Sequence, residues 1–334
     1  MIGEYRQESI YDVIADSIRE TDIPEEEKDY RIGKLMNTRM LKLNILLAGA
    51  AGSGKSSTIN AMFNTEVAEV GVGVNPETYA VSCYHLDNLT IWDTPGFGDG
   101  AEEDTRYSEM IAQKLDEKDA NGEPLIDIVL VVLDASSKDL GTSYQLINDV
   151  IIPHMKGRER QILIGLNQAD MAMKGKHWDV ERNAPDEILM DYLQKEAVSV
   201  GDRICSSTHL YSLARPVIYC AGYKEEGMEQ CKPYNLTKLL YEIVRSIPAE
   251  KRILVADTIR ADKDNWEHDD CEEDYKEEIK KSFIESVRES IGEGAEGLSW
   301  LGEHLLGIPG KGIGLILGGI AGGVFGFFTA IFDK

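Results

Sequence analysis

A glycine-rich run that ends in Gly-Lys-Ser carries the clearest chemistry in this sequence. Residues 49–56 read Gly-Ala-Ala-Gly-Ser-Gly-Lys-Ser, the spacing G-x-x-x-x-G-K-[ST] of a loop that wraps nucleotide phosphates. Apolar residues before it predict a short buried strand and residues 57–63 predict a helix, so a chance glycine turn is the weaker interpretation. Glycines let backbone N–H groups and the helix N-terminus point at negative charge. We therefore expect this phosphate loop to bind through Gly49, Ala50, Gly52, Ser53, Gly54, Lys55, Ser56 and Ser57.

Three positions further along the chain complete a phosphate and metal site. Lys55 is expected to reach the β- and γ-phosphates, and the Ser56 hydroxyl to ligate Mg²⁺. Asp93 closes an apolar strand and can hold Mg²⁺ through water, while the backbone N–H of Gly96 can bind the γ-phosphate. Thr78 lies in a glycine-rich stretch and would close over Mg²⁺ and the γ-phosphate, unless it is an ordinary loop threonine. The expected catalytic contacts are Lys55, Thr78 and Gly96, and the expected metal ligands are Ser56, Thr78 and Asp93.

Two later segments indicate which base the nucleotide carries. The run Asn-Gln-Ala-Asp at residues 167–170 follows an apolar strand, and Asp170 can accept hydrogen bonds from N1–H and the 2-amino group of guanine, an edge that adenine lacks. The run Cys-Ala-Gly at residues 220–222 ends another apolar strand, where a backbone N–H could meet guanine O6. Each pattern alone is weak, but both follow the phosphate loop in order. We therefore expect a guanine site made by Asn167, Gln168, Asp170, Cys220 and Ala221.

Together these motifs resemble a known family. The sequence is similar to the Era-like GTPases of the translation-factor class, and in particular to the bacterial YfjP-like GTPases, over roughly residues 40–248. The resemblance implies a Ras-like domain that binds GTP or GDP with Mg²⁺, hydrolyses GTP and changes shape between the two states. It rests on residues 49–56, 70–78, 93–96, 167–170, 220–222 and 233–236.

The sequence departs from the family pattern at three positions. Gln168 replaces a lysine, which predicts weaker nucleotide affinity with base specificity intact, because Asp170 remains. Gly52 stands where potassium-stimulated relatives have an asparagine, which argues against potassium activation. Phe97 stands where Ras-type enzymes carry a water-orienting glutamine, so we expect slow unaided hydrolysis and a missing group supplied by a partner, a second subunit or another part of the chain. Arg106 is a candidate for that group, with a solvated helix residue as the alternative.

The composition restricts the partners and the cellular compartment that we expect for this protein. The chain has 334 residues, a net charge of -24 and five scattered cysteines without a C-x-x-C pair. Such an acidic surface repels phosphate backbone, so direct nucleic-acid binding is not expected. The cysteine pattern fits a reducing cytosol, and we expect a cytoplasmic protein, with membrane association through its C-terminal segment as an open alternative.

Alternating strands and helices between residues 43 and 246 predict an α/β fold, a Ras-like doubly wound G domain with helical N- and C-terminal flanks. Beyond it, apolar residues recur every four positions over residues 275–291, which predicts an amphipathic helix that packs on its own chain or on a second copy. The expected organisation is a helical N-terminal extension (1–40), the G domain (41–248), an acidic amphipathic helical region (249–306) and a glycine-rich apolar segment (307–334).

The C-terminal segment is the second strong signal. Residues 312–332 are 21 residues without a charge, and at 1.5 Å per residue a helix of this length is about 31 Å long, near the bilayer hydrocarbon thickness. Glycines recur in it every four residues, a spacing that lets helices approach closely. The segment could be a membrane helix, an oligomerisation helix of a homo-oligomer or a hairpin buried under the amphipathic helix.

The functional hypothesis is a GTP hydrolase that acts as a nucleotide-dependent switch coupled to self-association or membrane association. The alternative is a GTP-dependent binding or assembly module of the ribosome-assembly type with negligible intrinsic hydrolysis. A membrane-remodelling or pore-type effector gated by nucleotide is a third hypothesis.

Overall fold

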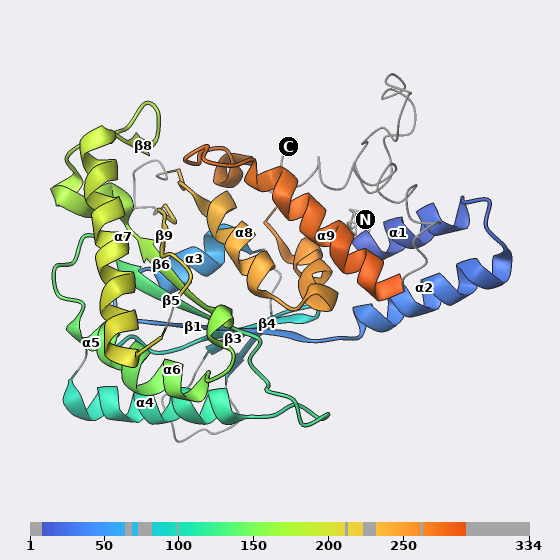
Figure 1. The fold of residues 1–334 in the computed structure, drawn as a ribbon, viewed down its shortest axis with the longest axis horizontal. Coiled ribbons are helices and arrows are strands. Elements are labelled where there is room, and N and C mark those ends of the chain that lie inside the picture. Colours follow the sequence, from blue (N-terminus) through green and yellow to red (C-terminus); the bar gives the residue numbers. More distant parts are fainter. Residues whose placement is uncertain are drawn as a thin grey trace, which may run out of the picture.

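A mixed β-sheet forms the centre of the computed structural model, which describes residues 9–63, 69–72, 82–98, 100–210, 213–222, 232–260 and 263–291. Within these residues the sheet has seven strands in the order β2-β3-β4-β1-β5-β6-β9 (Figure 1). Strands β4, β1, β5, β6 and β9 are parallel, β3 pairs antiparallel with β4, and β2 pairs antiparallel with β3. The strands are β1 (Leu43–Gly49), β2 (Glu69–Val72), β3 (Ser82–Leu86), β4 (Leu89–Asp93), β5 (Ile128–Asp134), β6 (Ile162–Asn167) and β9 (Val217–Ile218).

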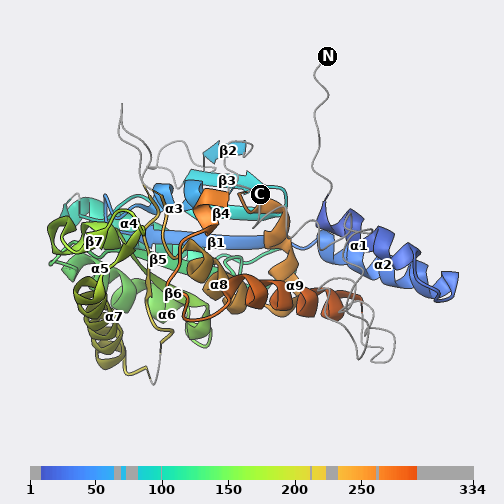
Figure 2. The same cartoon turned by 90° about the horizontal axis from the view of Figure 1, so that it is seen from above.

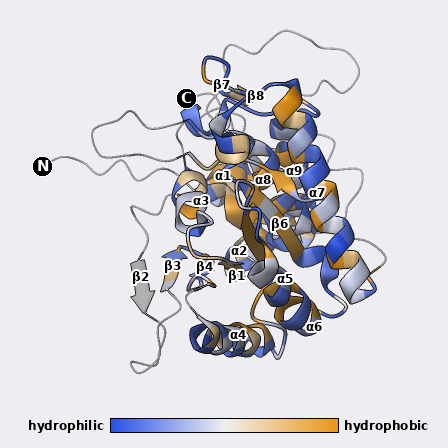
Figure 3. Cartoon of the chain, turned by 90° about the vertical axis from the view of Figure 1, so that its left-hand side faces the viewer, coloured by the Kyte–Doolittle hydropathy of each residue, from blue (hydrophilic) through white to orange (hydrophobic). Residues whose placement is uncertain are grey.

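The central strands are apolar along nearly their whole length because helices cover both faces of the sheet. All seven residues of β1 and all six of β6 are buried. Figure 3 shows the hydrophobic colouring concentrated on these strands and on the helix faces that meet them. The structure confirms the predicted α/β fold with helical flanks.

One face of the sheet is covered by α4, α7 and the helical segment between β5 and β6. Leu46 of β1 and Val131 of β5 share an apolar cluster with residues from these helices, among them Ile111 and Leu193. The N-terminus of α7 is capped by Asp186, whose carboxylate accepts hydrogen bonds from the backbone N–H groups of Ile188 and Leu189. The elements on this side are α4 (Ala101–Asp116), α5 (Gly141–Gln145), the π-helical turn η2 (Leu146–Ile151), α6 (Ile152–His154), η3 (Glu159–Gln161), η4 (Ala169–Gly175), β7 (Trp178–Asp179), β8 (Ala184–Pro185) and α7 (Glu187–Thr208).

The opposite face is covered by α3, α8 and η5, and α9 packs on α8 and η5. Helices α1 and α2 lie beyond one end of the sheet, next to α9 (Figure 2). They pack into the same apolar cluster as the sheet residues Leu47 and Leu130. The elements are α1 (Ile10–Arg19), α2 (Glu25–Arg39), α3 (Lys55–Met62), α8 (Leu236–Ser246), the 3-10 segments η5 (Ala249–Thr258) and η6 (Lys263–Trp266), and α9 (Tyr275–Ile291).

The amphipathic helix predicted over residues 275–291 docks on its own chain. Its apolar stripe is buried against α8, η5 and α2, and it consists of Tyr275, Ile279, Phe283, Val287 and Ile291. The N-terminal helix is anchored to the same flank, because Asp257 accepts hydrogen bonds from the Ser9 hydroxyl (2.6 Å) and the Ile10 backbone N–H (2.8 Å). The described flanks thus share one core with the sheet, and the division into four segments stays a prediction.

The membrane helix predicted for residues 312–332, and its alternatives of an oligomerisation helix or a buried hairpin, lie outside the described residues. Among the helices that the structure describes, none is long and apolar enough to cross a membrane.

Candidate nucleotide site

The phosphate loop connects β1 directly to α3 in a conformation that only glycine permits at two positions. Gly49 and Gly54 have φ values of 148° and 89°. A Cβ atom on Gly49 would lie 2.2 Å from the Val132 carbonyl oxygen, and one on Gly54 would lie 2.1 Å from Asn167 Nδ2. The loop is therefore packed against β5 on one side and the end of β6 on the other, with α3 beginning at Lys55.

The Lys55 ammonium group is held inside this loop. Its Nζ donates to the carbonyl oxygens of Gly49 and Ala50, each at 3.1 Å, and the residue is buried. A buried ammonium group at a helix N-terminus lined with backbone N–H groups is suited to binding an anion. This places Lys55 where the sequence predicts the phosphate contact.

Ser56 and Asp93, two of the predicted metal ligands, are in contact although they are 37 positions apart. We call this part of the site its metal side. The Ser56 hydroxyl donates to Asp93 Oδ2 at 3.0 Å. Burial raises the pKa of Asp93, while the hydrogen bond from Ser56 and the charge of Lys55 oppose the shift. Asp93 Oδ1 is buried and has no hydrogen-bond partner in the described part of the chain. A buried carboxylate oxygen without a partner is costly, and a hydroxyl beside a carboxylate is the oxygen donor set that Mg²⁺ prefers. These residues fit the predicted ion.

Thr78, the third predicted metal ligand, lies outside the described residues. Its expected role as a catalytic contact and metal ligand therefore stays a prediction.

The segment after β4 is hydrogen-bonded onto the phosphate loop. The Ala51 N–H donates to the Phe97 carbonyl at 2.8 Å, and the Phe97 N–H donates to the Gly49 carbonyl at 3.2 Å. Gly96 is packed so closely that a Cβ atom on it would lie 2.4 Å from Ala51 Cα. The Phe97 ring is buried edge-to-face on Tyr107 with centroids 6.0 Å apart. Phe97 thus contributes to the core, a role that its apolar side chain could have indicated. Gly96 lies beside the loop, and its contact with the γ-phosphate stays a prediction.

Asn167 and Gln168 tie the base-recognition segment to the phosphate loop. Asn167 Nδ2 donates to the Ser53 carbonyl at 2.9 Å, and its Oδ1 accepts from the Ala221 N–H at 3.0 Å. Gln168 has a left-handed backbone conformation (φ 60°), and its Nε2 donates to the Gly52 carbonyl at 2.7 Å. The glutamine thereby links the segment after β6 to the phosphate loop, and its effect on nucleotide affinity stays a prediction.

A cavity of about 320 Å³ lies beside these residues. Asp170 lines it, and Asp170 Oδ1 accepts a hydrogen bond from the Cys220 thiol at 3.0 Å. The sequence predicted Cys220 only for its backbone, and the orienting thiol was missed because its partner lies 50 positions away. Met171, also absent from the predicted set, contributes a half-exposed apolar side chain. The lining is Gly52, Gly54, Ser57, Asn167, Gln168, Asp170, Met171, Cys220, Ala221 and Gly222.

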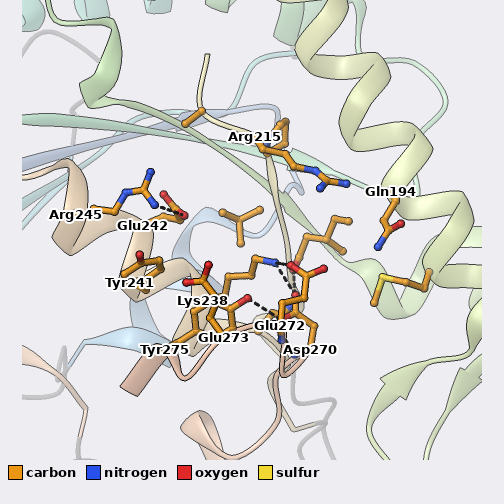
Figure 4. Close-up of a pocket in the computed structure, with 16 residues that line it drawn as sticks. Gln194, Arg215, Lys238, Tyr241, Glu242, Arg245, Asp270, Glu272, Glu273 and Tyr275 are labelled. Carbon is orange, nitrogen blue, oxygen red and sulfur yellow. Dashed lines mark hydrogen bonds and ion pairs between the residues drawn. The ribbon is translucent and has the colours of Figure 1, made fainter. Parts of the chain in front are cut away.

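A second cavity, of about 250 Å³, lies between α7, α8 and the segment that precedes α9 (Figure 4). Here Lys238 donates to Asp270 and Glu272, each at 2.7 Å, and the Tyr275 hydroxyl donates to Asp270 at 2.8 Å. We call these four residues the Lys238 cluster. Because Lys238 of α8 bonds to both carboxylates, the cluster attaches the segment before α9 to α8.

Comparison with known proteins agrees with the geometry of the first site. Residues 44–168, which include the phosphate loop and the segment after β4, match the family model described as 50S ribosome-binding GTPase. YfjP of Escherichia coli K12, described as uncharacterized, is 28% identical over 175 residues, 51% of this chain and 53% of YfjP. Septin-8-B of Xenopus laevis is 39% identical over 92 residues, 25% of this chain and 21% of the septin. The chain thus spans between 21% and 53% of the length of these curated relatives.

Two solved structures align over most of their length. Toc33 from Arabidopsis thaliana in complex with GDP and Mg²⁺ has a TM-score of 0.42 and 17% identity, covering 75% of this chain and 100% of Toc33. A probable GTP-binding protein, engB, has a TM-score of 0.35 and 17% identity, covering 61% of this chain and 97% of that protein. The assignment itself rests on the family match and on the geometry of the loop. The chain contains a P-loop G domain, which confirms the resemblance drawn from the motifs.

Proposed function

We propose that this protein binds GTP and GDP with Mg²⁺, hydrolyses GTP, and acts as a nucleotide-dependent switch coupled to self-association or membrane association. The observation that carries the proposal is the convergence of segments far apart in sequence at one edge of the sheet. The phosphate loop, the Asp93 segment and the guanine motif lie in contact there, with a cavity on the Asp170 side.

Each residue has one task in this scheme. Asp170 accepts hydrogen bonds from the guanine edge, and Lys55 neutralises charge on the β- and γ-phosphates. Ser56, Asp93 and Thr78 would hold Mg²⁺, which when bound would neutralise charge that develops on the phosphate oxygens. The Gly96 N–H donates to the γ-phosphate. Catalysis then depends on positioning and electrostatics rather than on a covalent intermediate.

Unaided hydrolysis is expected to be slow. The Phe97 ring is buried against Tyr107 and has no group that could orient water. Arg106 is exposed on α4, the helix that follows this segment, and a second subunit could use it as the missing cation. For scale, an arginine supplied in trans to Ras accelerates its GTP hydrolysis about 10⁵-fold.

A GTP-dependent assembly module with negligible hydrolysis is the second candidate, favoured by the description of the matching family model as a 50S ribosome-binding GTPase. The net charge of -24 disfavours direct contact with RNA, so such a module would bind ribosomal protein or a cofactor. Turnover per molecule that rises steeply with protein concentration favours the self-associating switch, and flat, very slow turnover favours the module.

The test of base recognition exchanges one carboxylate. Asp170→Asn replaces a side chain that only accepts hydrogen bonds with one that also donates them. The nucleotide preference should therefore shift from GTP to xanthosine triphosphate by about a hundredfold or more. The control is Asp134→Asn, a carboxylate at the end of β5 that is bonded to the Ser136 N–H and does not line the cavity. Fluorescent-nucleotide titrations of both variants measure the effect. An Asp170→Asn protein that keeps its guanine preference would falsify the site.

A further inference from the structure

The helix that carries Lys55 and Ser56 is short, and its far end is held by the C-terminal flank. Helix α3 has eight residues, a length that is marginally stable by itself. The carbonyl groups of its last turn have no partner within the helix. The donors that bond to these carbonyls therefore affect how well the other end of α3, which carries Lys55 and Ser56, is ordered.

Three successive carbonyls of that last turn accept hydrogen bonds from the flank, about 200 positions away. Arg260 donates its backbone N–H to Met62 O at 3.0 Å and its Nη1 to Asn60 O at 3.0 Å. The buried side chain of Asn265 donates its Nδ2 to Ala61 O at 2.9 Å.

The donors are themselves fixed in the flank. Phe63, the residue after α3, forms an antiparallel bridge with Ile259. The fully buried Trp266 donates its Nε1 to the Arg260 carbonyl at 2.7 Å. We call Ile259, Arg260, Asn265 and Trp266 the α3 clamp.

The segment that precedes the clamp, η5, is hydrogen-bonded to both helical flanks. In η5, which ends just before Ile259, the Ile253 N–H donates to Ser286 Oγ of α9 at 3.1 Å. Asp257, in the same segment, holds the N-terminus of α1 through Ser9 and Ile10. The clamp is thus a direct contact between the nucleotide helix and the elements that pack around α9 and α1.

We propose that Arg260 and Asn265 are positioning residues of the nucleotide site, which order the end of α3 and couple the nucleotide state to the helical flank. This inference rests on the proposed function and adds the route by which that function reaches the flank. Without the clamp, nucleotide binding must itself order the helix that carries Lys55 and Ser56, which lowers the apparent affinity. Because thermodynamic coupling is reciprocal, a partner that displaces α9 changes nucleotide affinity by the same factor.

The test uses the full chain and two measurements. Asn265→Ala removes one donor and should weaken GDP and GTP-analogue binding about three- to tenfold, the range expected for one net hydrogen bond. Hydrogen exchange of η5 and α9 should differ between the nucleotide-free and GTP-analogue-bound wild type, and this difference should disappear in Asn265→Ala. Arg260→Ala, which removes an exposed hydrogen bond, should act in the same direction, and Arg260→Lys should restore much of the affinity.

The matched control is Arg252→Ala. Arg252 bonds to Ile247 O and pairs with Glu285, so it fastens the flank without touching α3. It should lower the melting temperature and change nucleotide affinity much less than Asn265→Ala, because the donors from the clamp to α3 stay in place. The inference is overturned if Asn265→Ala lowers the melting temperature but keeps wild-type affinity, or if η5 and α9 exchange equally with and without nucleotide in a wild type that binds GTP. A wild type that does not bind GTP refutes the proposed function as well.

Discussion

The metal side of the nucleotide site and the Lys238 cluster both contain partly buried carboxylates, but they differ in how those carboxylates are satisfied. At the nucleotide site, Asp93 has one hydrogen bond to Ser56, and its other oxygen is buried without a partner among the described residues. In the Lys238 cluster, Asp270 accepts from Lys238, Tyr275 and the Glu272 N–H.

This difference separates a binding site from a structural contact. An unsatisfied buried carboxylate costs stability in the free protein, and a bound cation removes that cost. The Asp270 carboxylate in the Lys238 cluster already accepts hydrogen bonds on both oxygens, so it gains little from a further ligand. This holds although the cluster lines a cavity similar in size to the one beside Asp170. Cavity volume alone would not have distinguished the two regions.

The largest expected effect comes from removing one lysine in each region. Lys55→Ala should weaken GTP·Mg²⁺ binding about a hundredfold or more, because a charge-assisted contact to phosphate is lost. Lys238→Ala should leave nucleotide affinity unchanged and destabilise the fold by about 1–3 kcal/mol, because Asp270 and Glu272 lose their shared donor. Nucleotide titration and urea unfolding of both variants measure this. Equal loss of nucleotide affinity in the two proteins would contradict the comparison.

A carboxylate-to-amide exchange in each region should shift stability in opposite directions. In the nucleotide-free protein, Asp93→Asn should raise the free energy of unfolding by about 0.5–1.5 kcal/mol, because an incompletely satisfied buried charge is removed. Asp270→Asn should lower it by about 1–3 kcal/mol, because the groups that donate to Asp270, Lys238 and Tyr275 among them, lose a charged acceptor. Urea unfolding without nucleotide is the measurement, and destabilisation by Asp93→Asn would count against the unsatisfied-carboxylate interpretation.

The pH dependence of these two carboxylates should also differ in sign. Burial raises the pKa of Asp270, but the hydrogen bonds from Lys238 and Tyr275 outweigh it and hold that pKa below its usual value. Its stabilisation is present above the unfolded pKa of about 4 and is lost as pH falls through the folded pKa. The pKa of Asp93 is raised, so the free protein becomes relatively more stable as pH falls through that pKa. Unfolding curves of the two variants against wild type below pH 6 isolate each contribution.

The smallest effect is expected at the thiol that orients Asp170. Cys220→Ala removes the thiol that donates to the Asp170 carboxylate and, if Asp170 binds guanine as proposed, should weaken GTP binding about threefold to tenfold. Cys220→Ser keeps a hydroxyl donor and should retain wild-type affinity. Neither change should affect the Lys238 cluster, so unfolding curves serve as the control. If serine and alanine weaken binding equally, the thiol does not orient Asp170.

Most of the nucleotide site could be predicted from sequence because its residues belong to short local motifs. The glycine spacing of residues 49–56 predicted a loop that needs positive φ values, and the glycines of this loop have them. The apolar runs predicted the central strands, since burial on both faces of a sheet leaves a continuous apolar pattern. The stripe over residues 275–291 likewise predicted α9, although its docking partner was left open.

What the sequence by itself determined is therefore the local chemistry: a phosphate loop, a strand-end aspartate, a guanine motif and an amphipathic helix. Only the tertiary structure decided which distant groups complete these parts. It placed Cys220 against Asp170 and brought Arg260 and Asn265 to the end of α3. The physical reason is that a motif depends on neighbours a few residues apart. Hydrogen bonds between residues 50 to 200 positions apart exist only once the sheet and its flanks have packed.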